Sequence, residues 1–189
     1  MSNGGIDELI QDATRRMDKS VESTQVEFNT IRTGRASAAL LDRITVQYYG
    51  QATPLKQLAT INVPEPRLLT VQPFDPSSIK DIERAIQESD LGLTPSNDGK
   101  LIRLPIPQLT EERRTELVKI VRQLAEDGKI AIRNVRRDVD KHLKELKTKG
   151  DVGEDDERRA EDRVQKLTDE HTGKIDELLK RKEAEITEV

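Results

Sequence analysis

Five basic residues in the second half of the chain have the spacing of one helix face. Arg122, Lys129, Arg133 and Arg136 follow one another at intervals of seven, four and three residues, and Arg137 adjoins the last of them. Intervals of three, four and seven bring side chains to one side of an α-helix. A guanidinium group can donate two parallel hydrogen bonds to phosphate oxygens, so this row is suited to a nucleic-acid backbone. A solvated charged face is the alternative interpretation of the same pattern.

The charge of the surrounding sequence favours local binding over general attachment to polyanions. Residues 111–149 contain twelve Lys or Arg against eight Asp or Glu, whereas residues 151–189 contain eight against fourteen. The formal net charge of the chain is -4. An acidic remainder limits non-specific attachment while one basic strip engages phosphates.

Residue types that perform catalysis are scarce. The 189-residue chain has no cysteine, and it lacks the phosphate-loop, dinucleotide-binding, zinc-protease and nucleophile-elbow motifs. Its two histidines, His142 and His171, fall on predicted helix seams, where a partly buried polar role is expected. The acidic run Glu154–Glu157 is interpreted as a helix start. We therefore expect no active site, no metal and no cofactor, and the protein is predicted not to be an enzyme.

The basic row needs a long helix to carry it, and apolar spacing predicts three such helices. The first covers residues 6–32 and ends near Gly34, the second runs from Thr110 to Lys149, and the third begins at Glu154. In each, apolar residues recur at intervals of four and three, typical of one buried face. The predicted seam of the second helix contains Leu117, Val121, Leu124, Gly128, Ile132, Val135, Val139, His142 and Leu146. Mixed intervals favour a nearly straight three-helix bundle over a supercoiled dimer, and we expect a monomer.

A β-rich segment separates the first two helices. Residues 44–49, 58–63, 68–72 and 101–104 are predicted strands between turn residues such as Pro64-Glu65-Pro66 and Asn97-Asp98-Gly99, and residues 77–89 are a predicted helix. Tyr48 and Tyr49 are interpreted as packing residues. The predicted fold class is α+β, a long three-helix bundle with an inserted small β/α/β sandwich.

The predicted domains are residues 1–33 with 108–189 for the bundle, and residues 34–107 for the insert. The two connections would form a paired hinge, to which Arg32 and Arg35 add positive charge. The predicted hinge residues are Thr33, Gly34, Arg35, Leu104, Pro105, Ile106 and Pro107. No run of apolar residues is long enough to span a membrane, and the first residues lack a signal-peptide pattern, so a soluble cytoplasmic protein is expected.

Several short segments, taken in order, closely resemble the bacterial ribosome recycling factor family. They are Ile31-Arg32-Thr33-Gly34-Arg35-Ala36-Ser37, Tyr48-Tyr49-Gly50, Thr53-Pro54-Leu55-Lys56-Gln57-Leu58-Ala59, Ser89-Asp90-Leu91-Gly92-Leu93, Leu109-Thr110-Glu111-Glu112-Arg113-Arg114, Arg133-Asn134-Val135-Arg136-Arg137-Asp138 and Val164-Gln165-Lys166-Leu167-Thr168-Asp169. The resemblance extends from about residue 6 to the C-terminus. One departure is Gly153 ahead of the third helix, where serine is frequent in the family.

The resemblance implies an L-shaped protein of roughly tRNA dimensions that acts after peptide release. Members bind the post-termination ribosome against large-subunit rRNA and, with elongation factor G and GTP, separate its subunits. By motif match, Arg133 and Arg136 would contact rRNA, with Arg137, Arg32 and Arg35 as weaker candidates. A structural adaptor that binds protein partners through a charged bundle is the competing hypothesis. An enzyme with an unrecognised site in the insert is a third and has little support.

Overall fold

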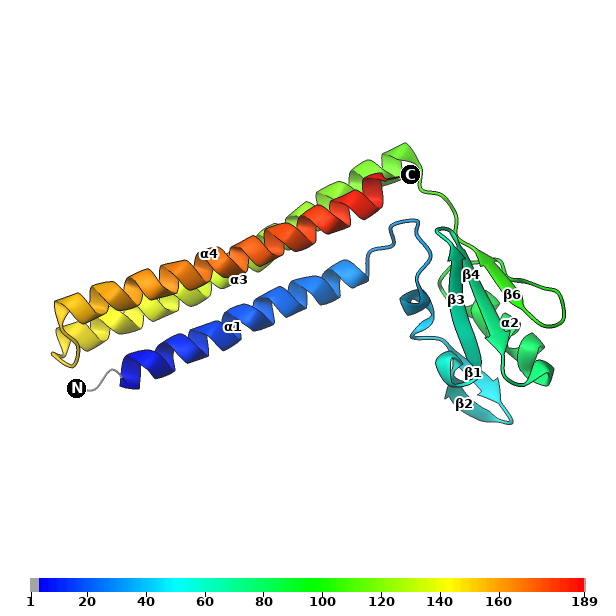
Figure 1. Cartoon of the computed structure of the whole chain (residues 1–189), viewed down its shortest axis with the longest axis horizontal. Coiled ribbons are helices and arrows are strands. Elements are labelled where there is room, and N and C mark those ends of the chain that lie inside the picture. Colours follow the sequence, from blue (N-terminus) through cyan, green and yellow to red (C-terminus); the bar gives the residue numbers. More distant parts are fainter. Residues whose placement is uncertain (1–3, 189) are drawn as a thin grey trace. The chain divides into compact units, whose positions relative to one another are not determined.

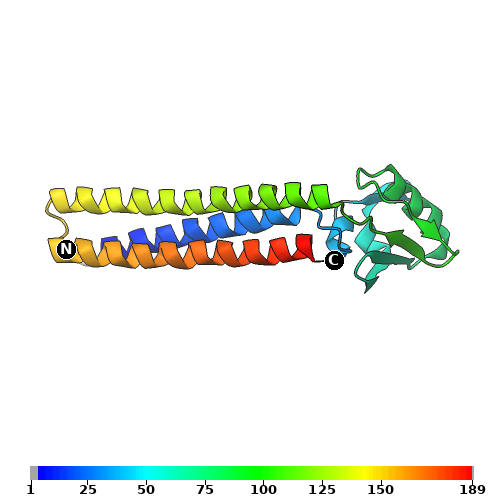
Figure 2. The same ribbon diagram turned by 90° about the horizontal axis from the view of Figure 1, so that it is seen from above.

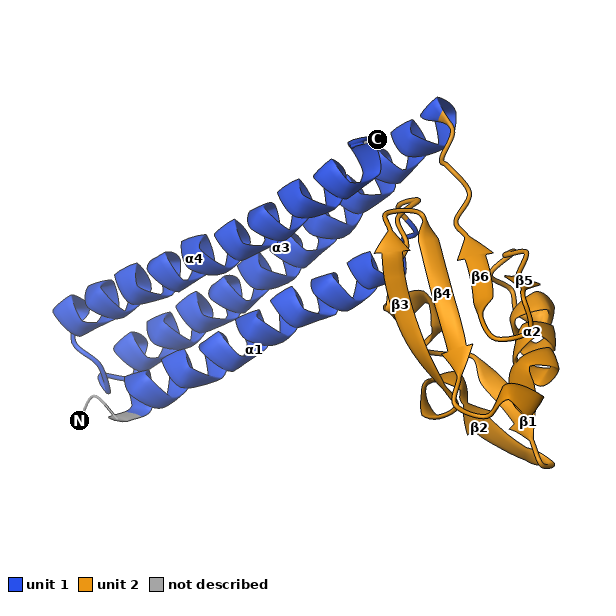
Figure 3. Ribbon diagram, turned by 45° about the vertical axis from the view of Figure 1, so that its right-hand side comes forward, with its two compact units in different colours: residues 1–32, 111–189 blue, residues 33–110 orange. Residues whose placement is uncertain are grey.

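The computed structural model describes residues 4–188, and the chain divides into two compact units (Figure 3). One unit comprises Thr33–Thr110, and the other comprises the helical segments before and after it. Both units are recognisable in Figure 1, where the three helical segments are blue, green to yellow, and orange to red, and the intervening unit is light blue to green. The predicted α+β class, with a helical bundle and an inserted β-rich segment, is confirmed.

The helical unit contains three long helices that all touch one another, and α3 runs antiparallel to the other two. They are α1 (Gly4–Asn29), α3 (Glu111–Thr148) and α4 (Glu154–Thr187). The 38 residues of α3 give it a length of about 57 Å. Figure 2 shows α3 and α4 running side by side with α1 between them in the view from above. The predicted three-helix bundle is therefore correct, although α1 ends before residue 32, because the turn bonds Thr30 N–H to Glu27 O and Ile31 N–H to Phe28 O close it.

Most buried residues of α3 are those predicted, but at two positions the next residue along the chain is buried instead of the predicted one. Ala125 and Leu143 are buried where Leu124 and His142 were expected, and Leu146 is only half-buried. His142 is exposed. From Leu117 to Leu146 the predicted and the observed seam both advance in steps of four and three that average about 3.6 residues, the period of an α-helix, and they differ only in where the steps of three fall.

Two features of the seam show how closely the helices approach. A Cβ atom at Gly128 would overlap the Thr24 hydroxyl and lie 2.9 Å from Ile175 Cδ1, so only glycine fits there. His171 is 2% exposed, with Nδ1 2.7 Å from the Leu167 carbonyl oxygen and Nε2 2.6 Å from Asp18 Oδ1. The predicted partly buried polar role is thus correct for His171 and wrong for His142.

The inserted unit has two antiparallel sheets and one α-helix. Strands β1 (Thr45–Tyr48) and β2 (Gln51–Pro54) form a hairpin, and the second sheet has the order β3-β4-β6-β5. Its strands are β3 (Ala59–Glu65), β4 (Leu68–Pro73), β6 (Ile102–Pro105) and β5 (Ser96–Asn97), and the helix is α2 (Ile79–Glu88). An aliphatic core joins α2 to the sheets; its fully enclosed members include Val46, Leu55, Leu69, Val71, Ile82, Ile86, Ile102 and Leu104.

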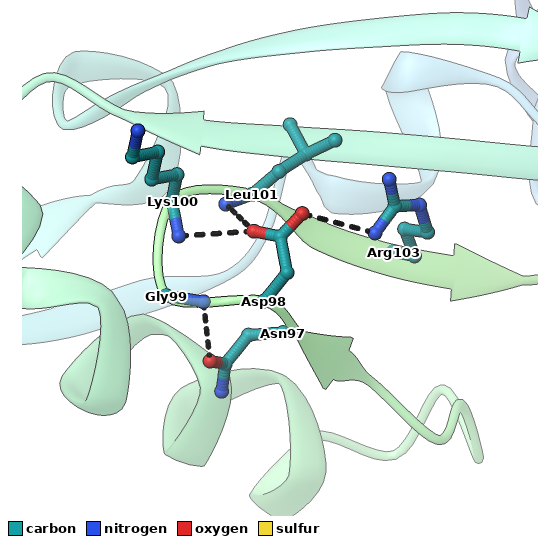
Figure 4. A network of polar contacts seen from close by, with 6 residues as sticks. All are labelled: Asn97, Asp98, Gly99, Lys100, Leu101 and Arg103. Atoms are coloured by element: carbon teal, nitrogen blue, oxygen red, sulfur yellow. Dashed lines mark hydrogen bonds and ion pairs between the residues drawn. The ribbon is translucent and has the colours of Figure 1, made fainter.

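Turn chemistry fixes the ends of these strands. Between β5 and β6 the Asp98 carboxylate accepts hydrogen bonds from the backbone N–H groups of Lys100 and Leu101, at 3.0 and 2.8 Å (Figure 4). These bonds, more than the nearby Arg103, lower the pKa of Asp98. Gly99 has φ 92°, so the predicted Asn97-Asp98-Gly99 turn is confirmed.

The sequence prediction missed four features of the insert. Strand β2 and the two-residue β5 were not expected, and β3 continues through Pro64 because a register shift between Asn62 and Glu65 removes the need for a ladder bond there. Tyr49 is 82% exposed with φ 49°, so its expected packing role is wrong. Its neighbour Tyr48 donates a hydrogen bond to Asp75 at 3.0 Å.

Candidate RNA-binding surface

Buried residues of α3 determine where its arginines lie. Ile132, Val135 and Val139 face the bundle seam, so the adjacent Arg133 and Arg136 stand at its margin and are half-buried. Arg137 is turned further from the seam and is exposed. The helix is continuous through this region, which gives the three guanidinium groups a fixed backbone support.

The predicted row of cations divides into an inner and an outer part. The inner row, Arg122, Lys129 and Arg136, advances in steps of seven and reaches across to α4. Arg122 Nε lies 2.6 Å from Glu183 Oε1, Lys129 Nζ 2.5 Å from Asp176 Oδ1, and Arg136 Nη1 3.3 Å from Gln165 Oε1. The partners on α4 step back toward its N-terminus, as expected for antiparallel helices.

The three cations of the inner row contact different kinds of group on α4. Arg122 and Lys129 are paired with carboxylates, and the Glu183 carboxylate raises the pKa of Arg122 through its hydrogen bond and its charge. Arg136 contacts a neutral amide at the edge of hydrogen-bonding distance, and the nearby Asp140 carboxylate interacts with it only through its charge. Of the three, Arg136 therefore keeps the most positive charge available for an external anion.

The outer row contains Arg133 and Arg137. Arg133 Nη1 lies 3.1 Å from Glu126 Oε1 on the preceding turns of the same helix, and the two side chains are 40% and 48% exposed. Such a pair contributes little and is easily exchanged for another partner. Arg137 makes no ion pair with any residue between 4 and 188. Both guanidinium groups are thus accessible to phosphate oxygens.

Carboxylates close to Arg136 complete the local electrostatics. Burial raises the pKa of Asp140, one turn further along α3, while the charges of Arg136 and Lys144 oppose that shift. Glu161 on α4 also has a raised pKa, caused first by burial and then by the neighbouring Glu157 and Asp140. Two carboxylates with raised pKa values therefore lie close to the cations around Arg136.

The other two predicted basic residues lie elsewhere. Arg32 follows α1, and the contacts of Arg16 with Asp138 and of Thr24 with Gly128 show that α1 and α3 are antiparallel. Arg32 is therefore at the end of the bundle where α3 begins, several turns from Arg133. Arg35 is exposed and belongs to the inserted unit. The structure thus brings together five of the seven predicted cations, all on α3.

Some of the predicted hinge residues are paired or hydrogen-bonded within the insert, and others lie outside strands and helices. Leu104 is buried in β6 opposite Leu69, and Pro105 is the last residue of that strand. Ile106 donates its N–H to the Arg67 carbonyl at 2.8 Å. Thr33, Arg35 and Pro107 lie outside strands and helices.

Gly34 brings the two connecting segments together. It has φ 78°, and a Cβ atom there would lie 3.1 Å from Leu109 Cγ. Both the backbone conformation and the close approach favour glycine at this position.

Sequence reasoning missed the partners on α4 and the basic residues beyond the arginine motif. Glu183, Asp176 and Gln165 could not be identified because local spacing does not give the register between helices. Lys141 and Lys144 could have been predicted, since intervals of four and three from Arg137 place them on the same helix face.

Within residues 4–188 no group of three or more His, Cys, Asp or Glu side chains could hold a metal ion. The search for long apolar helices over the same residues finds none able to cross a membrane.

Comparisons with known proteins identify the family. The family model described as ribosome recycling factor matches residues 24–187. The ribosome-recycling factor of Rubrobacter xylanophilus is 57% identical over 95% of this chain and 97% of its own length.

Two solved structures share the fold. The solution structure of a ribosome recycling factor superimposes with a TM-score of 0.79 at 40% identity and covers 100% of both chains. The T. thermophilus factor, described together with E. coli elongation factor G bound to the E. coli post-termination complex, has a TM-score of 0.66 at 48% identity, covering 96% of this chain and 98% of that one. Family model, relative and structures agree along almost the whole sequence, and the chain belongs to the ribosome recycling factor family.

Proposed function

We propose that this protein recycles ribosomes: it binds the post-termination ribosome and, with elongation factor G and GTP, splits it into subunits and releases it from mRNA. Family membership supports the proposal, as does the T. thermophilus relative described on the post-termination complex with elongation factor G. The observation that carries it in this chain is the accessible Arg133-Asn134-Val135-Arg136-Arg137 segment on a rigid helix. Such a protein acts where ribosomes are, in the cytoplasm.

The partner of the helical unit is large-subunit rRNA, and the arginines contribute unequally. Arg133 and Arg136 are the principal contacts, with Arg137 beside them, because none of the three is held by a confined carboxylate. Arg122 and Lys129 contribute less, since each must first leave a carboxylate on α4. Arg32 and Arg35 would act at a separate point near the connection between the units.

The protein works mechanically in this proposal and hydrolyses nothing itself. Binding of the arginines to phosphates seats the helical unit, while the GTPase partner supplies hydrolysis and moves the inserted unit. The connections at residues 33–35 and 106–107 then serve as the hinge. Leu104 and Pro105 move with the insert, because they are paired with β4. A hinge near Gly34 needs few residues to change their backbone angles.

The adaptor hypothesis is not retained, because the family match covers both the bundle and the insert. An adaptor would bind protein clients with little dependence on salt. No feature of the described surface favours that function over phosphate binding.

Light scattering tests the proposal directly. Post-termination ribosomes are mixed with this protein, elongation factor G and GTP, and each component is omitted in turn. A decrease in scattering that requires all of them is expected. Ribosome binding without any decrease, with an elongation factor G from a close relative of the source, would contradict the splitting role.

A further inference from the structure

The dipeptide Asp-Gly is chemically reactive, and the sequence contains it twice, at Asp98-Gly99 and at Asp127-Gly128. The backbone nitrogen of the residue after an aspartate can attack the aspartate Cγ atom and close a five-membered ring. Glycine allows this attack most readily, because it has no Cβ atom to obstruct the ring and its backbone turns most freely. Lysine follows the glycine at both places, so the two pairs differ in their surroundings and not in their local sequence.

The reaction rearranges the chain with water as its only other participant. The glycine nitrogen forms a bond to Cγ, and the carboxyl hydroxyl leaves with the amide proton as water, so that a succinimide remains. Water then opens the ring at one of its two carbonyl groups. Cleavage between nitrogen and Cγ restores aspartate. Cleavage between nitrogen and the α-carbonyl carbon leaves the chain running through Cγ as isoaspartate, with an additional methylene group in the backbone.

The pair in the helical unit is protected by its secondary structure. Asp127-Gly128 lies inside α3, which is continuous from Glu111 to Thr148. The Gly128 amide therefore belongs to the hydrogen-bond ladder of the helix. In addition, the Asp127 carboxylate accepts a hydrogen bond from Gln123 Nε2 at 2.9 Å. Ring closure at this pair requires α3 to open locally.

The pair in the insert lies in a turn that has no such ladder. Asp98 and Gly99 connect β5 to β6, and both residues are exposed. The attacking nitrogen is nevertheless engaged, because the Gly99 N–H donates a hydrogen bond to Asn97 Oδ1 at 3.1 Å (Figure 4). This one side-chain contact must break before the Gly99 nitrogen can reach Cγ.

The Asp98 carboxylate is also held, and on both of its oxygens. Oδ1 accepts hydrogen bonds from the N–H groups of Lys100 and Leu101, and Oδ2 accepts one from Arg103 Nη1 at 3.2 Å. The two backbone bonds direct the carboxylate toward the amides beyond Gly99. They also lower the pKa of Asp98 and so favour the carboxylate anion. The anion is a poor target for a nucleophile, since ring closure proceeds through the protonated carboxyl group.

We propose that Asp98 is a latent modification site, which isomerises to isoaspartate once the contact between the Asn97 side chain and the Gly99 amide is lost. Isoaspartate would lengthen the backbone of the turn and move the carboxylate onto Cα, so the hydrogen bonds to Lys100 and Leu101 would not re-form. The turn is also closed by the Asp98 N–H, which donates to the Leu101 carbonyl at 3.2 Å. Modification would therefore loosen the connection that sets β5 against β6.

Peptide mapping by mass spectrometry tests this site in the full chain kept at neutral pH. Isoaspartate is quantified at Asp98 and Asp127 in the same digest, so that Asp127 reports any opening of the helical unit. The variant Asn97→Ala removes the acceptor of the Gly99 N–H. The matched control Glu83→Ala removes the other contact of the Asn97 side chain, between its Nδ2 and the Glu83 carboxylate, and leaves the Gly99 bond in place. Wild-type protein in urea gives the rate without structure.

In Asn97→Ala, isoaspartate at residue 98 should form about 2 to 10 times faster than in wild type, the factor for one intramolecular hydrogen bond, with no change at residue 127. Glu83→Ala should keep the wild-type rate. In urea both pairs should react at similar rates, and faster than either does in the folded chain.

Three results would overturn the proposal. The first is an equal rate at residue 98 in the folded and the urea-unfolded chain, because the turn would then give no protection. The second is an unchanged rate in Asn97→Ala or an equal acceleration in Glu83→Ala, because the Gly99 bond would then not be the controlling contact. The third is equal acceleration at residues 98 and 127 in Asn97→Ala, which would attribute the effect to general unfolding.

Discussion

The two units of the molecule are held together in different ways. The insert closes around aliphatic side chains, and its buried polar residues are the small hydroxyls Thr70 and Ser78. The helical unit has a thin seam that also buries Glu157 and His171, each near polar partners at the margin. A closed core confers stability on a small body, whereas a long seam leaves most of each helix available for binding. The rows of cations lie on the part of α3 that the seam leaves accessible.

A core substitution in the insert should have the largest effect. Ile82→Ala removes a fully enclosed side chain, and a loss of about 2–5 kcal/mol in the free energy of unfolding is expected. Urea denaturation measures the loss, and hydrogen exchange shows where it acts. Exchange should accelerate within residues 33–110 and little in the helices. Ile130→Ala on α3, where the side chain is 44% exposed, is the control and should change stability by less than about 0.5 kcal/mol. Equal acceleration in both units would contradict their separate cores.

The closest approach in the helical seam should give the next effect. Gly128→Val places methyl groups against Thr24 and Ile175, and overpacking of this kind costs about 1–3 kcal/mol. Gly173→Val on α4 is the matched control, because nothing lies within 4 Å of a Cβ atom there. Thermal unfolding followed by circular dichroism should separate the two variants. Similar melting temperatures would show that the seam is looser than the structure indicates.

The insert also contains an acid-sensitive contact, at Asp75. The Ser77 hydroxyl, the Ser77 backbone N–H and the Tyr48 hydroxyl together hold the pKa of Asp75 below its usual value of 3.8. A depressed pKa stabilises the fold above the unfolded value, and this contribution disappears as the pH falls through the folded pKa. Asp75→Asn should therefore lessen the loss of stability of the insert as the pH falls below 3.8, measured as the urea midpoint. An unchanged pH profile would show that other carboxylates dominate.

The smallest predicted effect concerns the start of α4. Gly153 occupies the N-cap position with no side-chain hydrogen bond to the helix. Gly153→Ser supplies an acceptor for the first N–H groups and should stabilise the helical unit by a few tenths of a kcal/mol. The gain is measurable as a small rise in melting temperature. A decrease would indicate that the turn before α4 needs glycine for another reason.

Local patterns predicted the helices far better than they predicted the contacts between them. Apolar periodicity located α1, α3 and α4, since each buries one face along its whole length. Strand β2, with the sequence Gln-Ala-Thr-Pro, has no alternating pattern and forms because β1 pairs with it. Leu124 and Ala125 each lie three or four residues from Val121 and Gly128, so spacing alone could not decide which of the two is buried.

The residues of the candidate site could be predicted from the sequence, but their arrangement in space could not. The spacing of Arg122, Lys129, Arg133 and Arg136 placed them on one side of α3, as observed. Their division into an inner row tied to α4 and an accessible outer row depends on the register between two helices, whose contacting residues are 29 to 61 positions apart in sequence. Short-range sequence patterns do not specify the register between two helices.

Titration of ribosome splitting with the double variant Arg133→Ala, Arg136→Ala tests the central claim most directly. If these arginines seat the helical unit on rRNA, half-maximal splitting should require a much higher protein concentration, while the amplitude at saturation recovers. The effect should be stronger at higher salt, because the contacts are with phosphates. An unchanged half-maximal concentration, with the variant folded and the same elongation factor G present, would contradict the assignment of this surface to ribosome binding.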